Sequence, residues 1–199
     1  MLLRPITLAL AVVGAICVTA STADGQVTIR TSGGEVISFS QKNVVDHMIR
    51  GDSVEVEMAR LAQSRSQNAA VRDFADLLVK DHQSHLDNLR KLAGKHDIGR
   101  EANAADTSVM SSIRVLAELR AMPADSGFDR AFIREQVRDH VEDINSLKML
   151  RPAAKDDDLE HDVDRTMPVL QRHLARAREI AAQLGVAADT SRTTSPRRR

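Results

Sequence analysis

The segment Asn68–Lys95, with the sequence NAAVRDFADLLVKDHQSHLDNLRKLAGK, decides the fold class of this chain. Its apolar residues recur at intervals of three and four, which is the period of an amphipathic α-helix. They are Val71, Phe74, Ala75, Leu78, Leu86, Leu89 and Leu92. Asn68 is the predicted N-cap, and Gly94 or the turn at residues 96–99 ends the helix. The segment therefore predicts a long helix with one buried face.

The same period covers most of the remaining chain. It predicts further helices over residues 43–64, 107–121, 128–150 and 156–184. Gly51-Asp52-Ser53 interrupts the first and could cap a fresh helix start, and Pro168 predicts a kink or restart in the last. The fold class is all-α: a bundle of four long helices with an extra short helix between the second and third long ones.

The composition fits one domain and excludes several kinds of partner. The chain has 199 residues, 42% of them apolar, and its 28 basic side chains equal its 28 acidic ones. This balance produces no field that would attract nucleic acid, so we expect no nucleic-acid partner. Four Phe with no Trp or Tyr leave no aromatic platform for stacking bases or caging organic cations.

The N-terminus has the pattern of a secretory signal peptide. Arg4 precedes a run of about a dozen apolar residues, and small residues that suit a cleavage site follow. We predict a signal peptide over residues 1–23, which gives a periplasmic or secreted mature protein with no stable membrane span. A retained anchor is one alternative. Acylation of Cys17 is another, although Ile16 stands where lipoprotein signals carry a small residue.

Cleavage of this peptide would remove Cys17, the only cysteine. The mature protein would then have neither a disulfide nor a thiol nucleophile. Any metal would have to be held by His, carboxylate or Met.

The remaining flanks are short. Two alternating runs about Gly33-Gly34 predict either a linker or a small hairpin over residues 24–42. The helical domain is expected at residues 43–186, and the polar residues 187–199, which end in three Arg, are expected to form a disordered basic tail.

Histidines supply the unusual chemistry of this chain. At about 100° of rotation per residue, His82 and His85 lie within about 40° of the centre of their apolar stripe. By the same count His140 lies near the middle of its stripe, while His173 and Glu55 lie on the shoulders of theirs. One carboxylate and three or four imidazoles from four helices could therefore converge in the bundle core.

The same count gives no common site for the other three histidines, His47, His96 and His161. His161 faces solvent on the same count, and His96 lies in a turn. His47 projects inward only if its helix is continuous through Gly51.

Two interpretations of the inward set stay open. Glu55, His82, His85, His140 and His173 could bind a divalent transition metal such as Fe, Zn, Cu, Mn or Ni, as bundle cores do. Asp81 and Asp139, each beside an inward histidine, could be ligands or could hold a ring in one tautomer. Alternatively, nearby Asp, Glu and Gln136 satisfy the histidines without metal. The chain would then be a structural or interaction protein of the envelope, with an envelope component or a second copy as its partner.

Several motifs resemble exported bacterial proteins of the domain of unknown function 4142 family, over residues 43–184. They are SVEVEMARLA at 53–62, VRDFA at 71–75, KDH at 80–82, GFDRAFI at 127–133 followed by His140, and MPVLQRHL at 167–174. The resemblance implies a ferritin-like four-helix bundle exported to the periplasm or envelope, with no assigned activity. It also implies that recurring polar core residues fall on Glu55, His82, His140 and His173, whereas His85 is an addition.

The chain departs from the di-iron pattern of ferritin-like proteins, which needs Glu-x-x-His on two helices. Val79, Val137 and Leu170 stand three residues before the inward histidines, where that pattern has Glu. This disfavours a di-metal oxidase or hydrolase, and the absence of Tyr removes the usual radical partner. The sequence therefore favours a binding protein over an enzyme.

Overall fold

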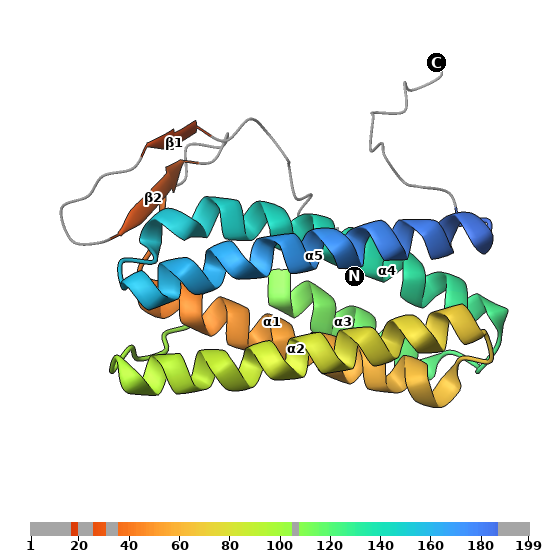
Figure 1. Cartoon of the computed structure of the whole chain (residues 1–199). Coiled ribbons are helices and arrows are strands. Elements are labelled where there is room, and N and C mark those ends of the chain that lie inside the picture. The colour runs from red at the N-terminus through yellow and green to blue at the C-terminus, as the bar shows by residue number, and fades with distance from the viewer. Residues whose placement is uncertain (1–16, 20–25, 31–35, 105–107, 187–199) are drawn as a thin grey trace, which may run out of the picture.

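The computed structural model describes residues 17–19, 26–30, 36–104 and 108–186. Four long helices lie side by side and form the predicted all-α bundle, which is therefore confirmed (Figure 1). They are α1 (Gln41–Arg65), α2 (Ala69–Lys95), α4 (Ser126–Leu150) and α5 (Asp157–Gln183). Short connections join α1 to α2 and, through the 3-10 turn η1 (Arg151–Ala153), α4 to α5, so each pair is antiparallel.

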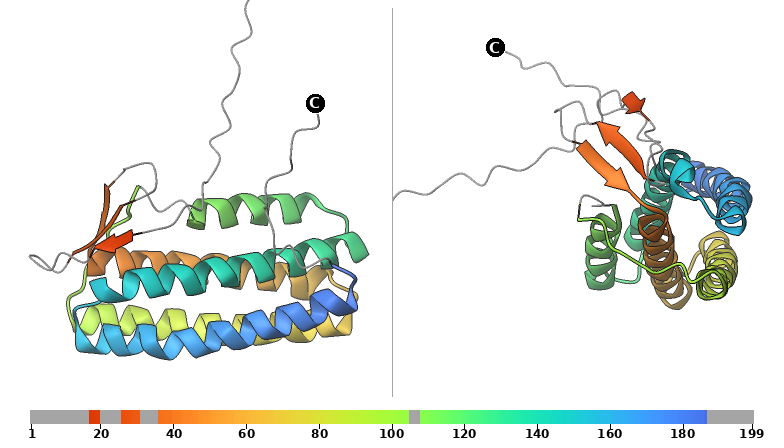
Figure 2. Two further views of the ribbon diagram at one scale, coloured as in Figure 1. Left: turned by 90° about the horizontal axis from the view of Figure 1, so that it is seen from above. Right: turned by 90° about the vertical axis from the view of Figure 1, so that its left-hand side faces the viewer.

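The short helix α3 (Ser108–Ala121) lies outside the four-helix square, against α1 and α4 (Figure 2). It buries Val109, Leu116 and Leu119 against them. Ile113, which the helical period placed on the inward face, is 43% exposed. The predicted cap at Asp106 lies outside the described residues. α3 thus covers one seam of the bundle and leaves the opposite helices uncovered.

Side-chain caps fix where the long helices begin. Ser40 and Asn43 form a reciprocal capping box at the start of α1, and Asn68 accepts hydrogen bonds from two first-turn amides of α2, as predicted. Asp125 and Asp156 do the same for α4 and α5. Each such cap contributes about 1 kcal/mol.

Two predicted helix boundaries were wrong. α1 continues through Gly51, because Ile49 and Val54 on either side are buried and this packing outweighs a helix penalty for glycine of about 1 kcal/mol. The long helix predicted from residue 128 begins instead at Ser126, because Asp125 accepts from the Gly127 amide at 2.7 Å. Of the kink or restart predicted at Pro168, the restart is excluded, since α5 continues through that residue.

Of the two alternatives for the N-terminal flank, the structure has the hairpin. β1 (Cys17–Thr19), β2 (Val27–Arg30) and β3 (Val36–Phe39) form an antiparallel sheet in that order. Val27 lies opposite Phe39 in the register, and both side chains are buried at one end of the bundle core. Apart from β1, the predicted signal peptide lies outside the described residues, as does the predicted basic tail.

No helix among the described residues combines the length and the apolar character needed to cross a membrane.

The hydrophobic core consists of two clusters that succeed one another along the bundle. The hairpin-end cluster contains, among others, Val27, Phe39, Ile49, Leu86, Ile144 and Leu170. The α3-end cluster contains, among others, Val54, Leu78, Ile133, Leu116 and Ala177. The change from one cluster to the other comes within one to about three turns on each long helix, and Val137 of α4 packs against both clusters.

Gly51 gives a direct test of the continuous α1. A Cβ atom built on Gly51 would meet nothing within 4 Å. Gly51→Ala should therefore raise the free energy of unfolding by about 0.5–1 kcal/mol, since alanine has the better helix propensity and no clash opposes it. Thermal denaturation should show a rise of about 2–4 °C per kcal/mol for a chain of this size. A loss of stability would mean that α1 is broken at Gly51, as the sequence suggested.

A candidate metal centre in the bundle core

Three histidines lie near the level where the two hydrophobic clusters meet. His82 lies between Leu78 and Leu86 on α2, and His140 lies between Ile133 and Ile144 on α4. On α5, His173 lies between Leu170 and Leu174 of the hairpin-end cluster, one turn before Ala177 of the α3-end cluster. Each helix therefore brings its histidine to the same depth, and we call these three residues the histidine layer. One ring nitrogen from each lies within 4.8 Å of the others.

Each imidazole of the histidine layer has one nitrogen held by an acceptor. His82 Nδ1 lies 2.9 Å from Asp52 Oδ1, and His173 Nε2 lies 2.9 Å from Asp81 Oδ2. His140 Nδ1 lies 3.0 Å from the backbone carbonyl of Gln136. A carboxylate or carbonyl can only accept, so the ring nitrogen facing it carries the proton and donates. These partners set the tautomer of all three rings.

The other nitrogens of the three rings face one another. His140 Nε2 lies 3.3 Å from His173 Nδ1, and His82 Nε2 is buried with no hydrogen-bond partner among the described residues. In a neutral imidazole the nitrogen without the proton is an acceptor. Three acceptors thus converge with no donor between them, which is an unfavourable arrangement unless a cation or a shared proton occupies the centre.

Burial keeps the rings of His140 and His173 neutral. His140 and His173 are 0% and 1% exposed. Burial, reinforced by the neighbouring His82 and His173, holds the pKa of His140 well below its ordinary value. Burial and His82 likewise lower the pKa of His173 to about 4, although its bond to Asp81 opposes the change. Neutral rings retain the lone pairs that bind metal ions.

His85 lies outside the histidine layer because carboxylates hold both of its nitrogens. Its Nδ1 lies 2.7 Å from Asp52 Oδ2, and its Nε2 lies 2.9 Å from Asp162 Oδ2 and 3.0 Å from the hydroxyl of Thr166. Although burial opposes it, these two carboxylates raise the pKa of His85 to about 10. We therefore take His85 to be a half-buried imidazolium. With His82 it also lowers the pKa of Asp52 against the effect of burial.

Glu55 also lies outside the histidine layer, although it shares helix α1 with Asp52. Its Oε2 accepts a hydrogen bond from Gln136 Nε2 at 3.0 Å. Burial and the adjacent Asp139 raise the pKa of Glu55 well above its usual range. The structure therefore brings together three of the five predicted site residues, His82, His140 and His173, and places His85 and Glu55 in two separate environments.

The sequence analysis missed the carboxylates that orient two of the histidines. Asp52 was interpreted as part of a helix break, yet it lies seven residues from both Val45 and Ala59, which are fully buried. Seven residues are almost two helical turns, so an unbroken helix places Asp52 on their face. Asp162 could have been placed inside in the same way, because its neighbours Leu159 and Val163 on the same helix are fully buried. Asp81 was expected to be either a ligand or a residue that holds a ring, and in the structure it contacts the ring of His173.

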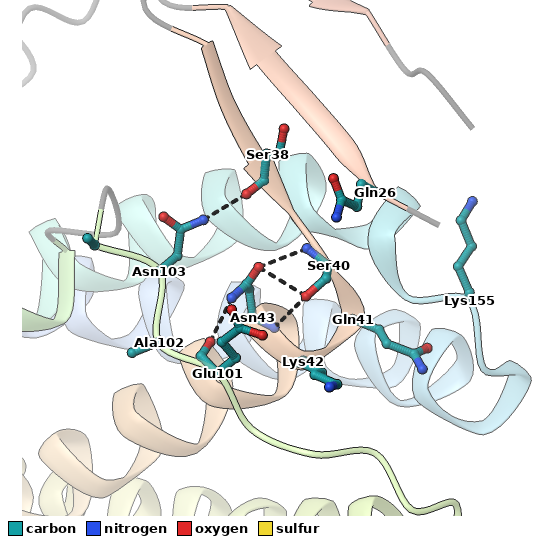
Figure 3. Close-up of a pocket in the computed structure, with 11 residues that line it drawn as sticks. Gln26, Ser38, Ser40, Gln41, Lys42, Asn43, Glu101, Ala102, Asn103 and Lys155 are labelled. Carbon is teal, nitrogen blue, oxygen red and sulfur yellow. Dashed lines mark hydrogen bonds between the residues drawn. The ribbon is translucent and has the colours of Figure 1, made fainter. Parts of the chain in front are cut away.

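A hollow in the surface lies at the hairpin end of the bundle, away from the histidine layer (Figure 3). Its volume is about 570 Å³, and residues of β3, the start of α1 and the segment after α2 line it. Asn103 donates to the Ser38 carbonyl at 2.8 Å, and Asn43 donates to the Glu101 carbonyl at 2.7 Å. These amides tie the segment after α2 to the hairpin and to the start of α1.

The ion pairs of His85 predict a stability that depends on pH. The folded pKa of about 10 exceeds the ordinary 6.5, so the stabilisation is complete below pH 6.5 and is lost as the pH rises to about 10. His85→Gln should lower the free energy of unfolding by roughly 2–4 kcal/mol at pH 6, since it leaves two buried carboxylates without their cation. Urea denaturation from pH 6 to 10 should show this difference shrinking. His161→Gln, at an exposed position, is the control; an H85Q difference independent of pH would contradict the assignment.

Comparison with known proteins identifies a family. A family model described as Domain of unknown function (DUF4142) matches residues 29–180. Neither the curated proteins nor the solved structures contain a significant match to this chain.

Proposed function

The chain belongs to the DUF4142 family, and we propose that it is an exported protein that binds one divalent transition-metal ion through His82, His140 and His173. One observation carries the proposal: three buried nitrogen acceptors face one another without a donor. The bonds to Asp52, Asp81 and the Gln136 carbonyl support it, because ligating imidazoles characteristically donate their other nitrogen to such acceptors.

The spacing of the nitrogens suits a metal ion. Bonds of 2.0–2.1 Å in a tetrahedral geometry place two ligand nitrogens about 3.3–3.4 Å apart. His140 Nε2 and His173 Nδ1 are separated by 3.3 Å. One nitrogen of His82 lies within 4.8 Å of a nitrogen of each of the other two rings. Little reorganisation is therefore required on binding.

The donor set narrows the choice of metal. Three neutral imidazoles without a carboxylate favour Zn, Cu, Ni or Fe over Mn, which prefers oxygen ligands. Three protein ligands also leave a fourth position for water or a small ligand. We do not extend the proposal to catalysis, because the Glu-x-x-His pairs of di-metal oxidases are absent from this sequence.

Export is the second part of the proposal, and it rests on the N-terminal sequence. Arg4, the apolar run and the small residues after it support cleavage near residue 23. Mass spectrometry of the protein recovered from a periplasmic extract would give the mature N-terminus. An intact Met1 on membrane-bound protein would instead favour the retained anchor.

Metal titration of the untagged protein tests the binding site. After chelator treatment, the unmodified protein should bind one equivalent of Zn²⁺. The variants His140→Gln and His173→Gln should each fail to bind that equivalent. Co²⁺ should give the visible absorption of a tetrahedral nitrogen site. At 100 times the dissociation constant, binding should add about 2.7 kcal/mol to the free energy of unfolding and raise the melting temperature by about 5–10 °C.

His161→Gln provides the matched control, because His161 lies on α5 like His173 but is exposed. It should bind Zn²⁺ as the unmodified protein does. If the unmodified protein takes up no Zn²⁺ at this site while both glutamine variants change only its stability, the histidine layer is a metal-free network that shares a proton between His140 and His173.

Asp81 gives a separate test of how the site is oriented. In Asp81→Asn the side-chain amide can donate a hydrogen bond to His173 Nε2. The ring proton can then move to Nδ1, which is the nitrogen that faces the centre of the histidine layer. We expect Zn²⁺ affinity to fall by roughly 10–100-fold, as for other residues that orient metal-bound imidazoles. Isothermal titration calorimetry should measure the change, with the exposed Asp73→Asn on the same helix as control. Equal affinity in both variants would exclude an orienting role for Asp81.

A further inference from the structure

Asp52 of α1 lies between two histidines of α2, one inside the histidine layer and one outside it. Its Oδ1 lies 2.9 Å from His82 Nδ1, and its Oδ2 lies 2.7 Å from His85 Nδ1. Asp52 is buried, and the two histidines stand three residues apart on one side of α2, so both rings reach the same side chain. Each oxygen of the carboxylate therefore serves one ring.

His85 occupies the outer oxygen of Asp52 and is itself held from the other side. Its Nε2 lies 2.9 Å from Asp162 Oδ2 and 3.0 Å from the hydroxyl of Thr166, both on α5. The ring of His85 is thus fixed from α1 and from α5, and it cannot turn without losing a contact on each side. This leaves only Oδ1 of Asp52 to accept from His82.

Asp52 is the single hydrogen-bond partner that His82 has among the described residues. His82 Nε2 is buried and has no partner there. His140 and His173 differ, because their inner nitrogens lie 3.3 Å from each other and their outer nitrogens meet the acceptors described above. The histidine layer therefore consists of two rings held at both nitrogens and a third ring held at one.

Packing hardly distinguishes the two orientations of the His82 ring. Its centroid lies 5.7 Å from that of His140 and 5.2 Å from that of His173. A half-turn about the Cβ–Cγ bond exchanges Nδ1 with Cδ2 and Nε2 with Cε1, and it leaves the filled space almost unchanged. After this turn a C–H group would face the centre of the layer. The bond to Asp52 is therefore what keeps Nε2 directed there.

We propose that Asp52, braced by His85, is a positioning residue that decides whether the histidine layer offers a metal ion three nitrogens or two. This inference rests on the proposed metal-binding function and adds what controls the site. Helix α1 contributes no ligand to the layer, yet through Asp52 it sets the direction of the third one. Three imidazoles leave one open position on a tetrahedral ion, whereas two leave half of its positions without a protein ligand.

Asp52→Asn tests the assignment, because asparagine has one oxygen for two N–H donors. The charged His85 should take that oxygen, since hydrogen bonds from ionised donors are the stronger ones. The amide group would then donate to His82 Nδ1, and the ring proton would lie on Nε2, facing the centre of the layer. We expect the affinity for Zn²⁺ to fall roughly 10–100-fold, and the visible absorption of bound Co²⁺ to change with the loss of one nitrogen.

NMR correlation of ring nitrogens with ring protons gives the tautomer of His82 in the metal-free protein, in mildly alkaline solution. The proton should lie on Nδ1 in the unmodified protein and on Nε2 in Asp52→Asn. Asp162→Asn removes an equal charge on the far side of His85, so it should keep the Nδ1 tautomer and lose less affinity. Glu57→Gln, exposed on the same helix as Asp52, is the control that should bind Zn²⁺ as the unmodified protein does.

Asp52→Glu covers the case in which Asp52→Asn does not fold. It keeps the charge and displaces the carboxylate, so a positioning role predicts weaker Zn²⁺ binding and a role of charge alone predicts no change. Unchanged binding in D52E, an unchanged His82 tautomer in D52N, or an equal loss of affinity in D162N and D52N would overturn the proposal. If the unmodified protein binds no Zn²⁺, the metal-binding function fails, whereas the tautomer measurement still decides whether Asp52 orients His82.

Discussion

The rest of the structure depends on one constraint: three imidazole nitrogens are removed from water at the same depth of the bundle. Each loses the hydrogen bonds that water would give, and a buried polar atom must find another partner. Asp52, Asp81 and the Gln136 carbonyl satisfy one nitrogen of each ring. This leaves the inner nitrogens facing a common centre, so the division of the core into two hydrophobic clusters is a consequence of the same layer.

The carboxylates of α1 serve two different environments because that helix is buried on two sides. Asp52 faces α2 and α5, where it lies between His82 and His85. Glu55 lies three residues later and faces α4 beneath α3. Three residues turn a helix by about 300°, which separates the two side chains by about 60° around the axis. The covering helix α3 is what turns the second face of α1 into an interior.

Periodicity alone was enough to predict the helices, the hairpin alternative and three residues that meet in the core, because helical rotation fixes which face a residue occupies. It could not give depth along the axis, which depends on how neighbouring helices are staggered. For that reason His85 was grouped with the histidine layer, although it lies outside it. Glu55 was grouped with it for another reason: its place on the shoulder of the apolar stripe did not show that it faces α4 beneath α3. Asp52 was missed for a different reason: a local glycine signal at Gly51 was weighted above packing on both sides of it.

The histidine layer is closed off from solvent, and this burial would affect how fast a bound ion exchanges. His82, His140 and His173 are 5%, 0% and 1% exposed, and they come from helices far apart in the chain. An ion could reach or leave such a centre only while the helices are transiently separated, so its exchange rate would follow the rate of local opening. A chain that folds after translocation would then keep whichever ion it met while folding. The identity of the bound ion would then depend on the compartment in which the protein folded.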